Sequence, residues 1–309
     1  MAEERVDFVE VGPRDGFQNW PQPVTTEVKV DLIRRALQAG VPRVEATSMV
    51  HPRWVPQMAD AEAVLAAVGA ANMDRIRVLV PNLRGFERAL TAGAGNVLVN
   101  IGVTEGFNQH NLNRTIAETL ADIADVLAAA RPAGVKVDAS ISVSWGCPYD
   151  GPVAPERVIE LGARLLQMGC HELSFGDTIG VATPTGVIEL CTRAVERFAN
   201  VPLFMHFHDT RGMALANALV ALECGVRGFE GSVGGIGGCP FAPNSTGNVC
   251  SEDLLALVHD LGYSTGVDVN ALAEAAQATS EALGAELPGR LYRAGPAPWL
   301  RAAAGATSA

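Results

Sequence analysis

The chain has 309 residues, of which 48% are hydrophobic and 18% charged, a composition typical of a globular protein and not of a disordered chain. A formal net charge of −11 argues against a nucleic-acid partner, because an acidic surface repels a phosphodiester backbone. No stretch reaches the roughly 18 consecutive apolar residues that a membrane span needs, and the acidic N-terminus lacks the apolar segment of a signal peptide. We therefore expect a cytoplasmic protein that binds neither membranes nor nucleic acid.

Short apolar and β-branched runs alternate with segments of helical periodicity along the whole chain. Thr25–Thr26–Glu27 can cap the first helical segment, and Pro155 and Pro184 suit first-turn positions of later ones. Each predicted strand follows soon after a helix stop such as Gly134 or Gly169. The predicted strands are Asp7–Asp15, Pro42–Met49, Ile76–Asn82, Asn96–Thr104, Val135–Ser144, Cys170–Thr178, Pro202–Thr210 and Gly228–Ile236.

Eight strand–helix units in succession predict a (β/α)₈ TIM barrel, because parallel strands with right-handed crossovers close naturally into one. A doubly wound open sheet is the alternative, but Gly12–Gly16 lacks the G-x-G-x-x-G dinucleotide fingerprint. Val269–Leu283 predicts an additional C-terminal helix. We expect one domain over residues 1–285, including a lid loop at 234–250, followed by a partly mobile tail at 286–309.

The active site of such a barrel lies at the carboxyl ends of its strands, so polar residues there are the candidates. His206 and His208 are two apart on a predicted strand, and their imidazoles therefore point to the same face. With a carboxylate from Asp15, this set suits Mg²⁺ or Mn²⁺, with Fe²⁺ and Co²⁺ as alternatives. The other candidates at this end are Glu10, Arg14, Glu45, Asp177 and Asp209.

Arg14 precedes Asp15, so it is either an ion-pair residue at the end of the strand or a fixed cation facing a developing enolate oxygen. A glycine-rich stretch, Gly234–Asn248, follows the eighth strand and contains Cys239. This stretch is a simple connection, a phosphate-binding loop or a catalytic lid, and a cysteine beside glycine hinges favours the lid.

Two other mechanisms find little support in the sequence. Schiff-base chemistry needs a lysine at the barrel mouth, but the two lysines lie in the first helix (Lys29) and at the start of the fifth strand (Lys136). A Ser-His-Asp hydrolase would need a G-x-S-x-G elbow, which the sequence lacks. The six cysteines form no C-x-x-C pair, so neither a zinc site nor a disulfide framework is predicted.

Several motifs together resemble those of the 3-hydroxy-3-methylglutaryl-CoA lyase family, over about residues 7–283. This resemblance implies a metal-dependent TIM-barrel lyase. The motifs are Val9–Gly16 (VEVGPRDG), Trp54–Met58 (WVPQM), Gly146–Tyr149 (GCPY), Gly176–Gly180 (GDTIG), His206–Asp209 (HFHD) and Gly237–Pro240 (GGCP).

The resemblance also implies roles for individual residues. Arg14 would stabilise the enolate of the departing acetyl-CoA, and Glu45 would orient Arg14. Asp177 matches a position implicated in metal-site or acid/base function, and Cys239 matches a lid cysteine linked to proton transfer. The implied metal ligands are Asp15, His206, His208 and Asn248.

The implied reaction is a retro-Claisen cleavage of an acyl-CoA substrate, 3-hydroxy-3-methylglutaryl-CoA, to acetyl-CoA and acetoacetate. The resemblance further implies a homodimer or higher oligomer. Two alternatives stay open, namely a metal-dependent condensing enzyme of the isopropylmalate synthase type and a non-catalytic binding protein. A chain that ends soon after its barrel, with Cys239 in the lid, favours cleavage over condensation.

The sequence departs from the family pattern at positions expected to line the acyl pocket. The fourth strand reads Val99–Glu105 (VNIGVTE) where the family pattern has a smaller Ala-Ser-Glu end, and Asp138 and Ser140 replace Arg and Tyr in the fifth. The segment Phe107–Arg114, expected to be a loop, is also unusually polar. These changes make citramalyl-CoA, cleaved to acetyl-CoA and pyruvate, an alternative substrate.

Overall fold

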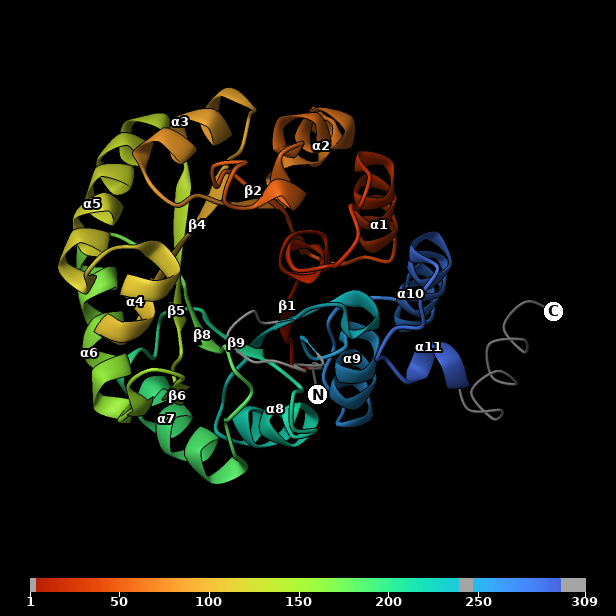
Figure 1. Ribbon diagram of the computed structural model, residues 1–309. Helices are drawn as coiled ribbons and strands as arrows, with labels where there is room; N and C mark the ends of the chain where they lie inside the picture. Colours follow the sequence, from red (N-terminus) through yellow and green to blue (C-terminus); the bar gives the residue numbers. More distant parts are fainter. Residues whose placement is uncertain (1–3, 239–246, 296–309) are drawn as a thin grey trace.

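The computed structural model describes residues 4–238 and 247–295, which form a closed barrel of parallel strands surrounded by helices (Figure 1). The strand order around the barrel is β1-β10-β9-β8-β5-β4-β3-β2, and neighbouring strands are parallel throughout. The predicted TIM barrel is therefore confirmed. Its strands are β1 (Asp7–Glu10), β2 (Arg43–Ser48), β3 (Ile76–Leu79), β4 (Asn96–Gly102), β5 (Lys136–Ser142), β8 (Leu173–Asp177), β9 (Leu203–Phe207) and β10 (Gly228–Gly231).

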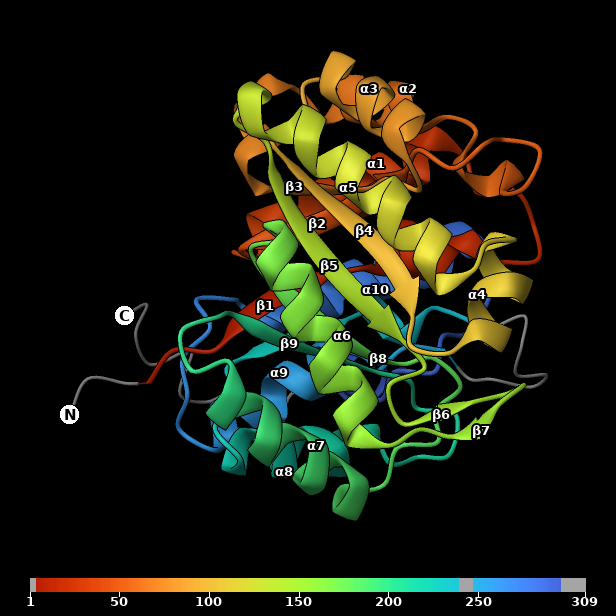
Figure 2. The same cartoon turned by 90° about the vertical axis from the view of Figure 1, so that its left-hand side faces the viewer.

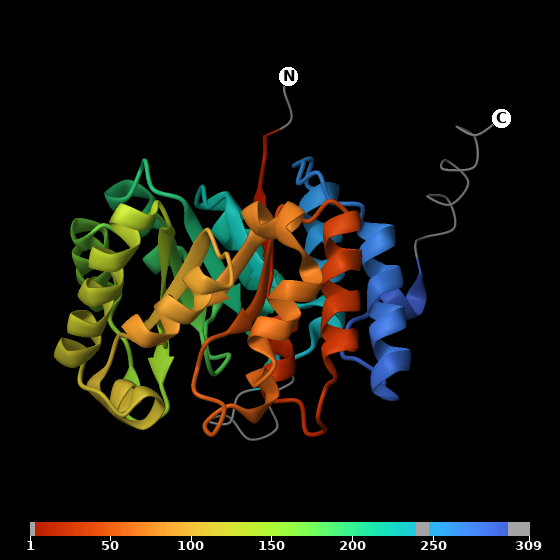
Figure 3. The ribbon, with the colours of Figure 1, turned by 90° about the horizontal axis from the view of Figure 1, so that it is seen from above.

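Helices cover the outside of the barrel, and the predicted additional C-terminal helix, α10, stands beside α1 (Figure 3). A short helix, α11, follows α10 and packs near α9. The helices are α1 (Thr26–Gln38), α2 (Ala61–Val68), α3 (Leu83–Thr91), α4 (Glu105–Leu112), α5 (Ile116–Ala133), α6 (Pro155–Met168), α7 (Pro184–Arg197), α8 (Ala214–Glu223), α9 (Ser251–Asp260), α10 (Val269–Leu283) and α11 (Leu291–Ala294).

Local sequence signals set several of these boundaries. Thr115 and Glu118 form a reciprocal capping box at the start of α5, and Pro155 and Pro184 occupy the first turns of α6 and α7. Gly134 and Gly169 end α5 and α6 in the left-handed backbone conformation, which glycine adopts without a steric penalty. These termini place each following strand close behind its helix.

The strands separate an apolar outer layer from a polar interior. Outward residues such as Val97 and Ile141 belong to the large hydrophobic core under the helices. Inside the barrel, Val9, Val11 and Phe204 form a small apolar cluster of their own. Many of the remaining inward positions hold charged or polar side chains, which must be paired because they are shielded from water.

The structure differs from the sequence expectation beyond β4. The segment from Phe107 to Arg114 was expected to be a loop, but most of it belongs to α4. Thr104 caps α4 by accepting a hydrogen bond from the Phe107 N–H, and the buried Asn108 side chain binds the backbone of Gly102 and Thr104. Polar residues therefore fasten this helix to the end of β4. Figure 2 shows α4 and an unpredicted hairpin, β6 (Gly146–Cys147) and β7 (Gly151–Pro152), beyond the ends of β4 and β5.

The predicted boundary at residue 285 stays a prediction, but part of the following segment packs on the barrel. Leu287 is buried, and the Gly289 N–H donates to the Gly234 carbonyl. Within the described ranges, no helix is both long and apolar enough to cross a membrane.

Candidate metal centre and active site

Arg14 and Asp15 lie on a tight helical turn, Gly12–Gly16, at the carboxyl end of β1. The strand was expected to continue to Asp15, but it ends at Glu10 because the N–H groups of Arg14, Asp15 and Gly16 all point back to the Val11 carbonyl. This turn brings both charged side chains to the barrel mouth.

Glu10 holds this turn in place, and it is not part of the charged cluster at the mouth as its position had suggested. Its carboxylate accepts hydrogen bonds from the Gly12 N–H at 2.7 Å, the Val233 N–H at 2.9 Å and the Ser251 hydroxyl at 2.5 Å. Burial is the main cause that raises the pKa of Glu10 to about 8. Glu10 therefore connects the turn that bears Arg14 to the start of the predicted lid segment.

Asp15, His206 and His208 meet at the mouth, and one ligand atom from each lies within 4.8 Å of the other two. The Nε2 atoms of the two histidines face each other at 3.1 Å. Asp15 Oδ2 lies 3.7 Å from His206 Nε2 and 4.0 Å from His208 Nε2. Two imidazole nitrogens and a carboxylate oxygen directed at one point are a donor set for a divalent cation.

The electrostatics of the cluster keep its carboxylate ionised. Burial raises the pKa of Asp15, but the positive charge of Arg14 and the nearby histidines outweigh burial and lower this pKa to about 2. Burial, followed by the neighbouring His206, lowers the pKa of His208 to about 4. Asp15 is therefore a carboxylate and His208 a neutral imidazole near pH 7, which are the protonation states that metal ligands need.

Two further observations agree with a cation at this cluster. Glu230 lies 2.9 Å from His206 Nδ1, which fixes the ring and turns Nε2 toward Asp15. Asn248 donates from Nδ2 to Asp15 Oδ2 at 2.9 Å, and its buried Oδ1 has no hydrogen-bond partner in the described part of the chain. The residues present therefore fit a divalent metal, with the Asn248 amide beside it.

Arg14 is held from two sides. It donates from Nε to Glu45 and from Nη1 to Asp15 Oδ1 at 2.6 Å, and Glu45 is fully buried. These two carboxylates, despite the opposing effect of burial, raise the pKa of Arg14 above its ordinary value. The structure thus brings Glu45 to Arg14, as the resemblance implied.

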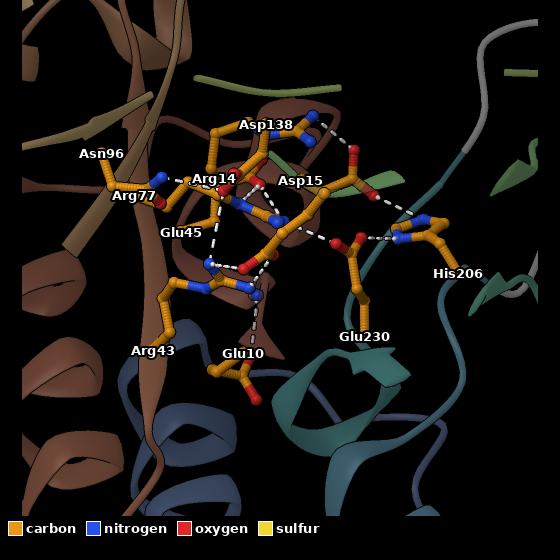
Figure 4. Close-up of polar contacts among 12 residues, drawn as sticks. Glu10, Arg14, Asp15, Arg43, Glu45, Arg77, Asn96, Asp138, His206 and Glu230 are labelled. Carbon is orange, nitrogen blue, oxygen red and sulfur yellow. Dashed lines mark hydrogen bonds and ion pairs between the residues drawn. The ribbon is translucent and has the colours of Figure 1, made fainter. Parts of the chain in front are cut away.

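Sequence reasoning missed Arg77 and Glu230, which complete the charged cluster shown in Figure 4. Arg77 lies on β3 and donates to Glu45 Oε2 at 2.8 Å and to Glu230 Oε1 at 2.7 Å. A detectable signal existed, since each is a charged residue inside a short apolar strand. Such residues are buried in a barrel only when they are paired.

Asp177 lies at the carboxyl end of β8, close enough to His206 for the two charges to interact. Its two carboxylate oxygens accept hydrogen bonds from the Val181 N–H at 2.8 Å and the Ala182 N–H at 3.1 Å. Burial raises the pKa of Asp177 to about 6 despite these bonds. The structure therefore brings Asp177 to the mouth, but it gives the side chain a loop-holding contact that the sequence did not indicate.

The structure corrects the position expected for Asp138. This residue lies near the start of β5, where it accepts hydrogen bonds from Asn96 at 2.8 Å and Arg43 at 3.3 Å. Because Arg43 and Asn96 are the first residues of β2 and β4, Asp138 lies at the end of the barrel opposite the mouth. It does not line a pocket at the mouth.

Cys239 lies outside the described residues.

The model of the HMGL-like family matches residues 5–279, a range that includes all the barrel strands. The chain belongs to this family. The resemblance predicted from the sequence motifs is thus confirmed. The relatives described next are named lyases, and they confirm the prediction of a carbon–carbon lyase.

Several curated HMGL-like relatives are similar over nearly the whole chain. The hydroxymethylglutaryl-CoA lyase of Pseudomonas mevalonii is 44% identical over 91% of this chain and 93% of its own length. The (R)-citramalyl-CoA lyase of Chloroflexus aurantiacus is 41% identical over 95% of this chain and 96% of its own. The chain spans 60% of the length of the Arabidopsis thaliana mitochondrial hydroxymethylglutaryl-CoA lyase, with 44% identity.

Solved structures of HMGL-like lyases have the same fold. The HMG-CoA lyase of Bacillus subtilis superposes with a TM-score of 0.91 at 39% identity and covers 95% of this chain and 99% of its own. The A. baumannii HMG-CoA lyase in complex with coenzyme A and 3-methylmalate has a TM-score of 0.90 at 32% identity, covering 95% of this chain and 96% of its own.

Proposed function

We propose that this protein cleaves 3-hydroxy-3-methylglutaryl-CoA to acetyl-CoA and acetoacetate with the help of a divalent cation, Mg²⁺ or Mn²⁺. The observation that supports this proposal most is that a candidate metal site and a fixed guanidinium lie side by side at the barrel mouth. Asp15, His206 and His208 converge on one point, and the Arg14 guanidinium is fixed directly beside them. The names of the curated relatives support the reaction class.

A cation held by Asp15, His206 and His208, with Asn248 as a fourth ligand, would supply Lewis-acid polarisation of substrate oxygens when bound. Arg14 would stabilise the negative charge that develops on the thioester oxygen as the carbon–carbon bond breaks. Because Glu45 and Asp15 already hold the guanidinium, it needs little reorganisation when that charge appears. The charge exists mainly in the transition state, so this interaction lowers the barrier selectively.

Proton transfer must accompany cleavage, because the substrate hydroxyl loses a proton and the acetyl enolate gains one. Asp177 is our candidate for the group near the hydroxyl, since it lies at the mouth and burial raises its pKa to about 6. Cys239, which lies outside the described residues, is our candidate for protonating the enolate.

The test is a product assay. The full-length protein with Mn²⁺ is incubated separately with 3-hydroxy-3-methylglutaryl-CoA and with citramalyl-CoA, and acetyl-CoA, acetoacetate and pyruvate are measured. We expect acetoacetate and acetyl-CoA in equal amounts from the first thioester. Absence of cleavage of that thioester, with the protein metal-loaded and folded, would refute the proposal.

Citramalyl-CoA is the second candidate substrate, favoured by the 41% identity to the Chloroflexus citramalyl-CoA lyase. Cleavage of citramalyl-CoA would require the same metal and the same Arg14. The two substrates would differ only in their contacts with the acyl pocket. Pyruvate release faster than acetoacetate release would establish it as the preferred substrate.

A cytoplasmic location and a homodimer or higher homo-oligomer remain predictions of this proposal. The named relatives include mitochondrial and cytoplasmic enzymes, so they do not single out a compartment.

A further inference from the structure

The charged residues inside the barrel form a closed cycle of contacts, which we call the charge ring. Each of its three carboxylates contacts a different partner with each oxygen. A final contact, 3.7 Å between His206 Nε2 and Asp15 Oδ2, closes the cycle at the candidate metal site. In order, the members of the charge ring are Asp15, Arg14, Glu45, Arg77, Glu230 and His206 (Figure 4).

Arg77 lies opposite Asp15 in the charge ring, three contacts away in either direction. It extends from β3 across the barrel interior to Glu230 on β10, and it is 1% exposed. Its guanidinium donates from Nε to Glu45 Oε2 and from Nη2 to Glu230 Oε1. A planar guanidinium with fixed donor directions sets the positions of both carboxylates at once, as a flexible ammonium could not.

Both carboxylates pass this constraint on to residues of the proposed active site. Glu45 uses its other oxygen to hold Arg14 Nε, and Glu230 uses its other oxygen to hold His206 Nδ1. The hydrogen bonds and ion pairs of the Arg77 side chain within the described residues go to Glu45 and Glu230, which lie between it and the residues of the proposed active site.

We infer that Arg77 is a positioning residue that sets Arg14 and the metal ligand His206 in register with each other, through Glu45 and Glu230. This inference rests on the proposed function for the role of Arg14. Its prediction about metal affinity, however, requires only that His206 binds the metal ion, whatever reaction the protein catalyses.

Arg43 offers a matched control inside the same barrel. It is a second arginine on an inward strand position, and it pairs with Asp138 and Glu172 at the end opposite the mouth. Replacing Arg43 therefore also removes an ion-paired arginine from the barrel, without touching a member of the charge ring.

The experiment compares Arg77→Met, Arg77→Lys and Arg43→Met with the unmodified full-length protein. Mn²⁺ binding to each EDTA-treated protein is measured by electron paramagnetic resonance, alongside circular dichroism, kcat and KM. For Arg77→Met we expect Mn²⁺ affinity and kcat each to fall about 10-fold to 100-fold, as is typical for the outer partners of metal ligands, with KM within about threefold. Arg77→Lys should recover part of the loss, and Arg43→Met should keep its Mn²⁺ affinity.

A folded Arg77→Met variant with unchanged Mn²⁺ affinity would overturn the inference, as would equal losses in the Arg77 and Arg43 variants. If Arg77→Met does not fold, Arg77→Lys decides, because its shorter, single ammonium cannot match both contacts of the guanidinium. At least threefold weaker Mn²⁺ binding then supports the inference, and unchanged binding overturns it. If the unmodified protein binds Mn²⁺ but cleaves neither thioester, the proposed function fails while the affinity comparison still tests Arg77.

Discussion

Arg14 and Glu45, 31 residues apart in the chain, form a partly buried ion pair at the mouth of the barrel. Glu45 is on β2 and Arg14 is on the turn after β1, so the pair joins two neighbouring strands at the level of the metal cluster. The ion pair fixes the Arg14 guanidinium beside the candidate metal site of Asp15, His206 and His208 before any substrate arrives. The predictions below follow from this arrangement.

Replacing Arg14 should separate catalysis from metal binding. Arg14→Gln removes the donor that faces the developing enolate oxygen, and loss of one such donor costs about 2.7 to 4 kcal/mol of transition-state stabilisation, or roughly 100-fold or more in kcat. Mn²⁺ affinity should be unchanged or tighter, because a positive charge next to Asp15 is lost. Steady-state kinetics and Mn²⁺ titration measure the two effects, with the exposed Arg84→Gln on α3 as the control. Turnover within threefold of the unmodified protein would exclude this role for Arg14.

Replacing His206 should abolish both properties together. His206→Gln removes a ligand atom and its connection to Glu230, so Mn²⁺ affinity should fall at least about 100-fold and cleavage should fall with it. His171→Gln is the control, since His171 is exposed and precedes β8 at the end of the barrel opposite the mouth. Retention of tight Mn²⁺ binding in His206→Gln would show that the metal lies elsewhere.

Glu10 should make the stability of the metal-free protein depend on pH. Burial raises its pKa from the usual 4.5 to about 8, so the folded protein keeps a proton that the unfolded chain releases between these values. The stabilisation is therefore complete below about pH 4.5 and is lost as pH rises to about 8.

Glu10→Gln should remove this dependence, because an amide oxygen can still accept from Gly12 and Val233 while the amide nitrogen donates to Ser251. Urea unfolding in EDTA at pH 5 and pH 8.5 should show the unmodified protein losing up to about 4 kcal/mol more than the variant. The exposed Glu87→Gln should behave like the unmodified protein. Parallel pH profiles for Glu10→Gln and the unmodified protein would contradict the expectation.

Asp138 should not influence substrate choice, in contrast to the sequence-based expectation. The residue lies at the strand-start end, whereas Asn100, which donates to Ser142 at 2.8 Å, lies closer to the mouth on the same pair of strands. Asp138→Asn should leave the ratio of acetoacetate to pyruvate release unchanged within error. Asn100→Ala should change the ratio of acetoacetate to pyruvate release several-fold, which is the size of effect expected from the loss of one hydrogen bond. A ratio that responds to Asp138 and not to Asn100 would reverse this assignment.

Much of the barrel and part of the site were predictable from local sequence patterns. The eight barrel strands follow from apolar runs ended by helix stops, and the shared direction of His206 and His208 follows from the two-residue period of a strand. Arg14 and Asp15 were placed at the correct end of the barrel, although the strand ends before them.

The remainder depends on contacts that no local pattern contains. Arg77 and Glu230 are 153 residues apart and meet across the barrel interior once the strands have closed. Whether Asp138 lies at the mouth or at the opposite end depends on its height along the barrel axis. A strand predicted to begin at Val135 does not fix this height. Helix α4 was missed because its amide-rich composition resembles a loop, whereas in the structure Asn108 is buried against the end of β4.

The most direct test of the account is a Mn²⁺ titration of the EDTA-treated protein in which bound metal and cleavage of 3-hydroxy-3-methylglutaryl-CoA are followed together. We predict no cleavage without metal and a rise in activity in proportion to occupancy, with saturation at one Mn²⁺ per chain. Full activity in the metal-free protein, or activity that does not follow occupancy, would contradict it.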